Sequence, residues 1–203
     1  MADTFGKYDV YAVAGSFYCY PNTNVLRNRF GIRDAQELKQ VETDISVIRQ
    51  NDLLLNPIFG RFTPNHLKRI HRYLLGDVYP FAGNYRREDI AKGTTRFLHH
   101  EEIAQKLSRL LEQLHDEQCL KGLEAQDFIK RGAWYFAELN YIHPFREGNG
   151  RAIREFVRQL FLQAGYLVDW GMVSPERLLH AMIDSVYDTD SLIEVIRLCL
   201  EPL

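Results

Sequence analysis

Apolar side chains recur at helical spacing along most of the chain, and this periodicity limits the possible folds more than any other feature. Residues three and four apart share a helix face, whereas a strand would show strict alternation. Similar patterns begin at Asp34 and at Thr63-Pro64 and cover residues 125–142, 148–164, 174–185 and 189–200. The clearest stripe lies in residues 99–118 and consists of Ile103, Leu107, Leu110, Leu111 and Leu114. The chain is therefore predicted to be all-α.

Capping and turn residues predict where these helices begin and what connects them. Asp34 suits the cap of a helix whose apolar stripe runs on to Ile48, and Pro64 suits a first helical position. Residues 79–97 lack helical periodicity and predict a loop followed by a short β-hairpin that turns at Lys92-Gly93.

The composition allows one sizeable hydrophobic core. The chain has 203 residues, of which 46% are hydrophobic and 26% are charged, and its formal net charge is -2. This balance gives no reason to expect nucleic acid or an acidic membrane as a partner, so any basic site must be local. Residues 1–33 are rich in Tyr, Gly and Asn and are expected to be largely loop. Residues 34–203 are expected to form a single domain.

The cysteines and the N-terminus bear on the compartment. Cys19, Cys119 and Cys199 are odd in number, far apart and without a CxxC pair. This pattern is typical of free thiols in a reducing compartment and argues against a disulfide framework and a zinc site. No basic stretch precedes a long apolar run, and no segment is long and apolar enough to span a bilayer. We expect a cytosolic protein.

The run His-Pro-Phe-Arg-Glu-Gly-Asn-Gly-Arg-Ala-Ile-Arg, from His143 to Arg154, gathers reactive groups where a helix should begin. Pro144 tells against continuation of the preceding helix. His143 is therefore expected at a helix end, on a loop beside the N-terminus of the next helix. Such a histidine is a candidate general base. For a lone histidine the favoured interpretation is that it offsets a helix dipole, and the surrounding residues favour the base instead.

The segment Gly148-Asn149-Gly150 is expected to form an anion-binding turn. Two glycines let backbone N–H groups turn toward one point, and the helix N-terminus adds unpaired donors. Arg151 and Arg154 share a face of the first turns, where cations oppose the helix dipole, so an anion such as phosphate should compensate them. The alternatives are a turn that only starts the helix and a solvated polar face, which Arg158 would continue.

Glu147 directly precedes this turn. A carboxylate beside a phosphate site is repulsive unless a cation lies between them, and Mg²⁺ binds one or two carboxylates together with substrate phosphates. Glu147 is therefore a candidate Mg²⁺ ligand, and its alternative role is that of an exposed acid stabilising a helix N-terminus. The chain has neither a dinucleotide fingerprint nor a Walker P-loop.

The whole run resembles the signature of the Fic family of enzymes. All eight fixed positions of His-x-Phe-x-Glu-Gly-Asn-Gly-Arg-x-x-Arg agree. At average residue frequencies, such agreement has a chance on the order of 10⁻¹⁰ per window. Residues 79–86 and 92–97 also resemble the second conserved stretch and the flap hairpin of this family. The resemblance covers roughly residues 20–200 and is nearest to bacterial Fic toxins and to translocated effectors of Bartonella.

The resemblance implies a Fic-type bundle of about seven to eight helices with a small β-hairpin flap. It also implies protein adenylylation, in which AMP passes from ATP to a Ser, Thr or Tyr hydroxyl of a target protein. Carried onto this chain, His143 would take the hydroxyl proton, and Glu147 would hold Mg²⁺ on the α- and β-phosphates. Gly148, Asn149 and Gly150 would seat these phosphates, Arg151 would help to hold them, and Arg154 would pair with the γ-phosphate.

The flap would bind the target and border the nucleotide. Residues 90–97 would add a strand to an extended target segment. Adenine contacts are expected from the C-terminal helices. The candidates are Ile90, Arg96 and Phe97 for the target, Lys92, Gly93, Thr94 and Thr95 for the nucleotide, and Tyr187, Leu179 and His180 for adenine. Without the resemblance, Phe97 is as well explained by core packing.

Many Fic proteins carry an inhibitory helix with the pattern Ser/Thr-x-x-x-Glu-Gly/Asn, whose Glu pairs with the arginine that matches Arg154. Residues 1–60 and 170–203 contain no such pattern. The chain therefore resembles the class inhibited by a small separate antitoxin, although a Fic domain of a larger effector is the alternative. The implied target is a topoisomerase II-type subunit or a host protein. The implied location is the bacterial cytoplasm, with delivery into a host or recipient cell as the alternative.

Other functions remain open from the sequence. Family members that transfer a different phosphate-bearing group, such as a phosphoryl group, typically depart from the Gly-Asn-Gly-Arg sequence, which is intact here. A nucleotide-binding regulatory module without turnover would be expected to lack His143 or Glu147, and both are present. A structural helical adaptor would give Arg151 and Arg154 no reason to converge.

Overall fold

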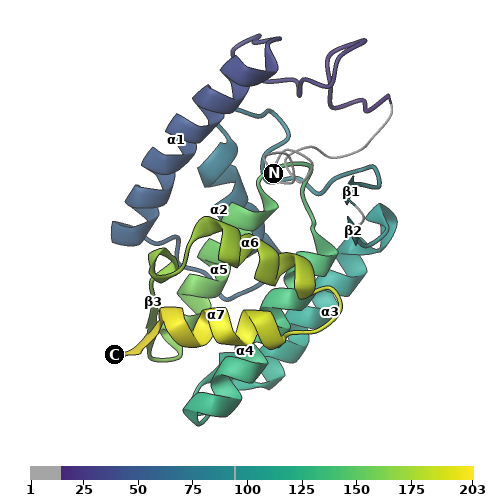
Figure 1. Cartoon of the computed structure of the whole chain (residues 1–203). Helices are drawn as coiled ribbons and strands as arrows, with labels where there is room; N and C mark the ends of the chain where they lie inside the picture. The colour runs from purple at the N-terminus through teal and green to yellow at the C-terminus, as the bar shows by residue number, and fades with distance from the viewer. Residues whose placement is uncertain (1–14, 94) are drawn as a thin grey trace.

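The computed structural model describes residues 15–93 and 95–203, which contain seven α-helices and two small sheets (Figure 1). The α-helices are α1 (Ala35–Leu55), α2 (Pro64–Leu75), α3 (Ile103–Asp116), α4 (Ala125–Ile142), α5 (Asn149–Gln163), α6 (Pro175–Asp184) and α7 (Asp190–Cys199). The strands are β1 (Ala91–Lys92), β2 (Thr95–Arg96), β3 (Tyr166–Val168) and β4 (Leu200–Pro202), and 3₁₀ turns lie at His100–Glu102, Gln118–Leu120 and Trp170–Met172. The predicted all-α fold with a small hairpin is confirmed.

The helices begin where the capping residues predict. The Asp34 carboxylate accepts hydrogen bonds from the backbone N–H groups of Gln36 and Glu37 at the start of α1. Thr63 caps α2, and Pro64 is the first residue of that helix. These side chains satisfy N–H groups that have no partner within the helix, which is why each helix starts there.

The core centres on α4 and α5. Phe128 and Phe136 of α4 and Phe156 and Phe161 of α5 are fully buried. The rings of Phe128 and Phe161 meet edge to face, with centroids 4.8 Å apart. A Cβ on Gly132 would lie 2.6 Å from the Phe161 ring, so the close approach of α4 and α5 requires glycine there.

Each sheet pairs two short strands. In the hairpin β1–β2, Ala91 pairs with Arg96 and Lys92 with Thr95, which confirms the predicted turn after Lys92. The sequence did not predict the antiparallel pair β3–β4, which joins the segment after α5 to the segment after α7. Strands of three residues that are so far apart in sequence leave no local turn pattern to detect.

Two predictions about helix faces are wrong. Ile48, expected on the apolar stripe of α1, is 68% exposed, and α1 instead buries Leu38, Ser46 and Leu53. Arg158, expected on a solvated face of α5, is buried, and it donates hydrogen bonds to the Glu155 carboxylate and to the Leu53 carbonyl. Arg158 is buried because α1 lies beside this side of α5, where Arg151 and Arg158 bond to Ser46 and to the Leu53 carbonyl. Among the described residues, none of the helices has the length and apolar character needed to cross a membrane.

Candidate active site

His143 ends α4 in a fixed and unusual geometry. Its backbone is left-handed, with φ 46° and ψ 62°, and its side chain is buried. The ring Nδ1 lies 3.0 Å from the Asn140 carbonyl oxygen, which can only accept, so Nδ1 carries the proton and Nε2 keeps its lone pair. Burial, together with the positive charges of Lys92 and Arg86, lowers the pKa of His143. The imidazole is therefore neutral near pH 7 and is in the form that accepts a proton.

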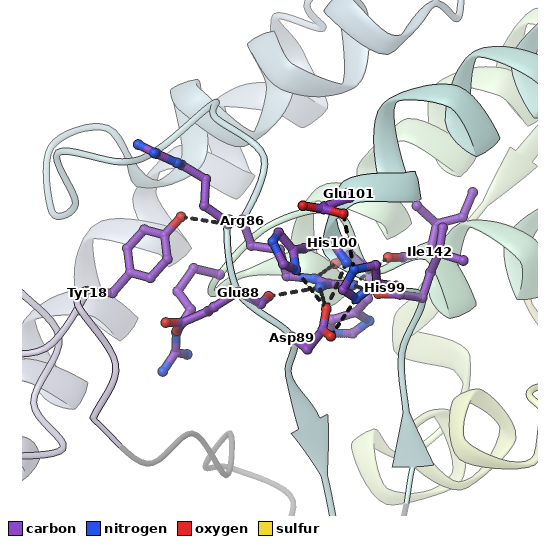
Figure 2. A network of polar contacts seen from close by, with 12 residues as sticks. Tyr18, Arg86, Glu88, Asp89, His99, His100, Glu101 and Ile142 are labelled. Atoms are coloured by element: carbon purple, nitrogen blue, oxygen red, sulfur yellow. Dashed lines mark hydrogen bonds and ion pairs between the residues drawn. The ribbon is translucent and has the colours of Figure 1, made fainter.

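A buried arginine fixes the backbone around His143. Arg86 donates from Nε to the His143 carbonyl at 2.9 Å and from its terminal nitrogens to the carbonyls of Glu88, Leu98 and Ile142 (Figure 2). The Arg86 backbone N–H also donates to the Pro144 carbonyl at 2.8 Å. One side chain thus ties the end of α4 to both sides of the flap.

A buried histidine and an asparagine close the loop that follows. His71 accepts from the Gly83 N–H at Nδ1 and donates from Nε2 to the Glu147 carbonyl at 2.8 Å. Burial lowers the pKa of His71 to about 4, which keeps the ring neutral and suits these two roles. The Asn149 side chain bonds both the N–H and the carbonyl of Phe145. Asn149 therefore shapes the turn with its side chain.

Gly148 cannot be replaced without disturbing this loop. Its φ is 76°, a left-handed value that favours glycine, and a Cβ would lie 2.0 Å from the Leu75 side chain. The turn before α5 is therefore packed directly onto α2. Residues 148–150 thus lie at the N-terminus of α5, where the sequence places the predicted anion-binding turn.

The two arginines of the motif have different surroundings. Arg151 donates to the Ser46 hydroxyl at 2.8 Å and pairs with the Glu42 carboxylate, both on α1. Within residues 15–93 and 95–203, no carboxylate comes into ion-pair range of Arg154. Burial and the neighbouring Arg151 cation lower the pKa of Arg154 to about 10, so its positive charge is poorly compensated. Arg151 is thus paired with a carboxylate, whereas Arg154 has no carboxylate partner in the part of the chain that the structure describes.

Glu147 lies beside the turn at Gly148 and the Arg151 guanidinium. Its carboxylate accepts from the Gly148 N–H at 2.9 Å and lies 3.9 Å from the Arg151 guanidinium. One carboxylate next to a phosphate-binding turn is a donor set that Mg²⁺ commonly completes with phosphate oxygens and water.

These residues line one cavity of about 680 Å³ between the N-terminus of α5, the flap and α6. Its size falls in the range of small-molecule sites. The flap contributes Lys92, Thr95 and Phe97, and α6 contributes an apolar wall that includes Leu178 and Met182. Thr95 and Trp170 also line the cavity, and the Thr95 hydroxyl and the Trp170 indole N–H are buried without a hydrogen-bond partner among the described residues.

The structure brings most of the predicted site residues together at this cavity. The lining includes His143, Glu147, Gly148, Asn149, Gly150, Arg151, Arg154, Lys92, Thr95, Phe97 and Leu179. The lining does not include Gly93, Ile90, Arg96, His180 or Tyr187, and Tyr187 is 78% exposed. Ile90 is instead buried in the protein, and Thr94 lies outside the described residues.

Phe97 lies directly against the candidate base. Its ring stacks on the His143 ring with centroids 3.7 Å apart and an interplanar angle of 14°. The flap therefore touches the candidate base itself.

Comparison with known proteins agrees with this geometry. The Fic/DOC family profile matches residues 61–161. Over 176 residues the chain is 40% identical to the probable protein adenylyltransferase Fic of Salmonella typhimurium, covering 87% of this chain and 84% of that protein. The chain is a member of the Fic family.

Other Fic proteins extend the comparison. The protein adenylyltransferase VbhT of Bartonella schoenbuchensis is 41% identical over 179 residues, which cover 88% of this chain but only 37% of VbhT. The crystal structure of the BepC protein of Bartonella tribocorum with bound AMPPNP superposes with a TM-score of 0.85 at 26% identity. That match covers 92% of this chain and 97% of the BepC chain.

Three residues that organise this Fic site were missed by sequence reasoning. Arg86 and His71 act through buried hydrogen bonds that join distant segments, and Glu42 reaches Arg151 from α1. Glu42 and Ser46 are four residues apart on α1, so they share one polar face. This polar face of α1 could have indicated a contact with a charged group. It was overlooked because the apolar residues of the same helix were used to predict which side is buried.

Proposed function

We propose that this chain is a protein adenylyltransferase that moves AMP from ATP to a hydroxyl side chain of a target protein. The observation that supports this most directly is the uncompensated Arg154 guanidinium in a cavity that also contains a helix N-terminus and a neutral histidine. A polyphosphate would neutralise the Arg154 charge and accept hydrogen bonds from the helix N-terminus. A neutral histidine can take the proton of a nucleophilic hydroxyl.

The geometry supports in-line displacement at the α-phosphate. Nε2 of His143 takes the proton of the target hydroxyl as its oxygen bonds to the α-phosphorus. The bond from that phosphorus to the bridging oxygen breaks, and diphosphate leaves with the electron pair. Backbone donors at the N-terminus of α5, with Gly150 among them, and the guanidinium of Arg154 hold the phosphate oxygens in place. Positioning and charge stabilisation supply most of the acceleration in such transfers.

Glu147 is proposed to hold Mg²⁺ against the phosphates. The single carboxylate beside the anion-binding turn fits this ion, which neutralises phosphate charge when it is bound. Arg151 supports the same end of the site from α1, where Glu42 fixes its orientation.

The nucleotide base is proposed to lie against the apolar wall of α6, near Leu178, Leu179 and Met182. The flap is proposed to position the target by strand addition, with Phe97 against the incoming side chain. The target is a protein, of topoisomerase II-subunit or host type. The proposed partner in the producing bacterium is a small antitoxin that carries an inhibitory helix. The proposed location is the bacterial cytoplasm, and the alternative is export as an effector into a host or recipient cell.

The first test is a transfer assay with α-labelled ATP, Mg²⁺ and cell lysate. We expect label on a protein band, and a fall of about 10²- to 10⁴-fold in His143→Ala, because a general base is lost. Label from γ-labelled ATP alone would indicate phosphoryl transfer. ATP binding without any labelled protein would contradict the proposal and favour a regulatory module.

The second test separates the two arginines. Arg154→Ala should leave the free energy of unfolding nearly unchanged while weakening ATP use at least tenfold, since one charge-assisted contact is worth about 1.5–3 kcal/mol. Arg151→Ala is the matched comparison and should destabilise the fold, because the Glu42 carboxylate would keep the Tyr79 hydroxyl but lose its cationic partner. A large fall in melting temperature for Arg154→Ala would count against its role as a ligand-binding residue.

A further inference from the structure

A second cluster of reactive side chains lies at the base of the flap, outside the nucleotide cavity. One Asp89 carboxylate oxygen lies 2.6 Å from Nδ1 of His99, and the other lies 3.0 Å from Nδ1 of His100 (Figure 2). The His100 backbone N–H also donates to Asp89 at 2.8 Å. None of these three residues lines the cavity at the start of α5.

The three side chains converge like ligands of a metal ion. One ligand atom from each residue lies within 4.8 Å of the others. Two imidazole nitrogens and a carboxylate suit a first-row transition-metal dication, whereas Mg²⁺ and Ca²⁺ prefer oxygen atoms alone. The side chains are partly exposed, so an ion could enter and water could complete its coordination. The cysteine spacing excludes a thiolate zinc site and has no bearing on nitrogen and oxygen donors such as these.

A second carboxylate supports this assignment. Nε2 of His99 lies 3.6 Å from the Glu101 carboxylate. Histidines that bind a metal through one nitrogen usually direct the other N–H toward a carboxylate or carbonyl. A metal bound at Nδ1 of His99 leaves the ring proton on Nε2. That N–H faces the Glu101 carboxylate, which can accept a hydrogen bond from it. The buried Arg86 guanidinium is 3.6 Å from Asp89, and its positive charge lowers the affinity of the three residues for a metal cation.

We propose that Asp89, His99 and His100 bind a divalent transition-metal ion of the Zn²⁺ class and so join the two ends of the flap. Asp89 directly precedes the hairpin segment 90–97, and His99 and His100 follow it. A shared ion therefore closes a loop around the hairpin. This site is independent of the proposed AMP transfer, because its binding can be measured without ATP or a target.

The test is calorimetric titration of the untagged, metal-free protein with Zn²⁺. We expect one ion per chain, and we expect binding to fall at least tenfold in His99→Ala and in His100→Ala. Glu101→Gln should weaken binding by about tenfold, since outer partners of metal ligands typically contribute at least that much. Hydrogen exchange of residues 90–98 should slow when Zn²⁺ is added to the wild-type protein and should not change in the two histidine variants.

Two controls address other places where zinc could bind. Glu147→Gln removes the candidate Mg²⁺ ligand, and Cys119→Ser removes a thiol that lies 3.8 Å from Nδ1 of His115. Both variants should bind Zn²⁺ as the wild type does. If either loses binding while the His99→Ala and His100→Ala variants keep it, the proposal is overturned.

Cobalt provides a measurement that does not depend on whether a variant folds. The visible spectrum of wild-type protein with Co²⁺ should show ligand-field bands of nitrogen and oxygen ligands without a thiolate charge-transfer band. A thiolate band, or a spectrum identical to that of aqueous Co²⁺, would contradict the assignment.

Discussion

Two stacked ring pairs have the same geometry but are held by different surroundings. One pair involves the loop between α4 and α5, residues 143–148, and the other involves the flap. In the loop, Phe145 stacks on His71 with centroids 3.7 Å apart and an interplanar angle of 14°. In the flap, Phe97 stacks on His143 at the same distance and angle. Phe145 is fully buried, whereas Phe97 is half-buried and belongs to a hairpin with two residues in each strand.

The difference lies in what else holds each pair. Backbone groups from residue 142 to residue 147 are bonded by Arg86, His71 and Asn149, which come from three separate segments. Among the described residues, the flap is held by a short ladder, the Phe97 stack, the polar cluster at its base and the Arg86 bonds to the Glu88 and Leu98 carbonyls. The candidate base is thus fixed from three segments, whereas the flap, which is proposed to meet the protein target, is held mainly at its base.

Arg86→Leu is expected to have the largest effect and would test how strongly the loop is supported. It leaves several carbonyls buried without donors, at about 1–3 kcal/mol each, so the free energy of unfolding should fall by about 4 kcal/mol or more. Denaturant unfolding would measure this loss. Arg87→Leu changes the exposed neighbour and should stay within about 0.5 kcal/mol. Equal losses in both variants would mean that Arg86 does not organise the loop.

The pH dependence of stability gives a somewhat smaller effect. His71 has a pKa of about 4 in the folded protein, below the value near 6.5 expected when it is unfolded. Between these values the unfolded chain binds the proton and the folded chain does not, so stability falls as the pH drops. The expected loss from pH 6.5 to pH 4 is about 3 kcal/mol.

Unfolding by urea at several pH values would measure this loss. Burial also lowers the pKa of His143 and His66, so they add to the slope in the same direction. In His71→Gln the slope should become shallower, and an unchanged slope would show that His71 titrates normally in the folded protein.

Phe97→Ala should have the smallest effect on stability, about 1 kcal/mol, because it removes one half-buried stacked pair. Transfer of AMP to the protein target should fall more than hydrolysis of ATP by water, since only the former needs the flap. Phe145→Ala is the matched control and should cost about 3–5 kcal/mol. If thermal unfolding shows similar losses for both variants, the flap is as firmly held as the loop.

Sequence reasoning predicted the helices and the residues of the motif because both depend on local patterns. Periodicity placed α4 at the residues observed, and Pro144 with Gly148 fixed where α5 begins. The same reasoning missed Arg86, His71 and Glu42, whose hydrogen bonds join residues more than 50 positions apart. No local pattern distinguishes a buried arginine of this kind from a solvated one.

The weakest predictions concerned side chains whose role depends on tertiary packing. Tyr187 was chosen because an aromatic residue near the C-terminus could meet adenine, yet it is exposed and away from the cavity lining. Trp170, which does line the cavity, had no motif to mark it. The sequence could place such residues on elements but could not orient one element against another.

The left-handed backbone at His143 has a consequence for how inactive forms of this protein would behave. Glycine and asparagine adopt that conformation more readily than histidine does. A variant with either residue at this position would give up proton transfer and relieve local strain, so loss of catalysis need not bring loss of structure. The chain thus carries an imidazole where glycine or asparagine would be less strained, as the proposed role of His143 in proton transfer requires.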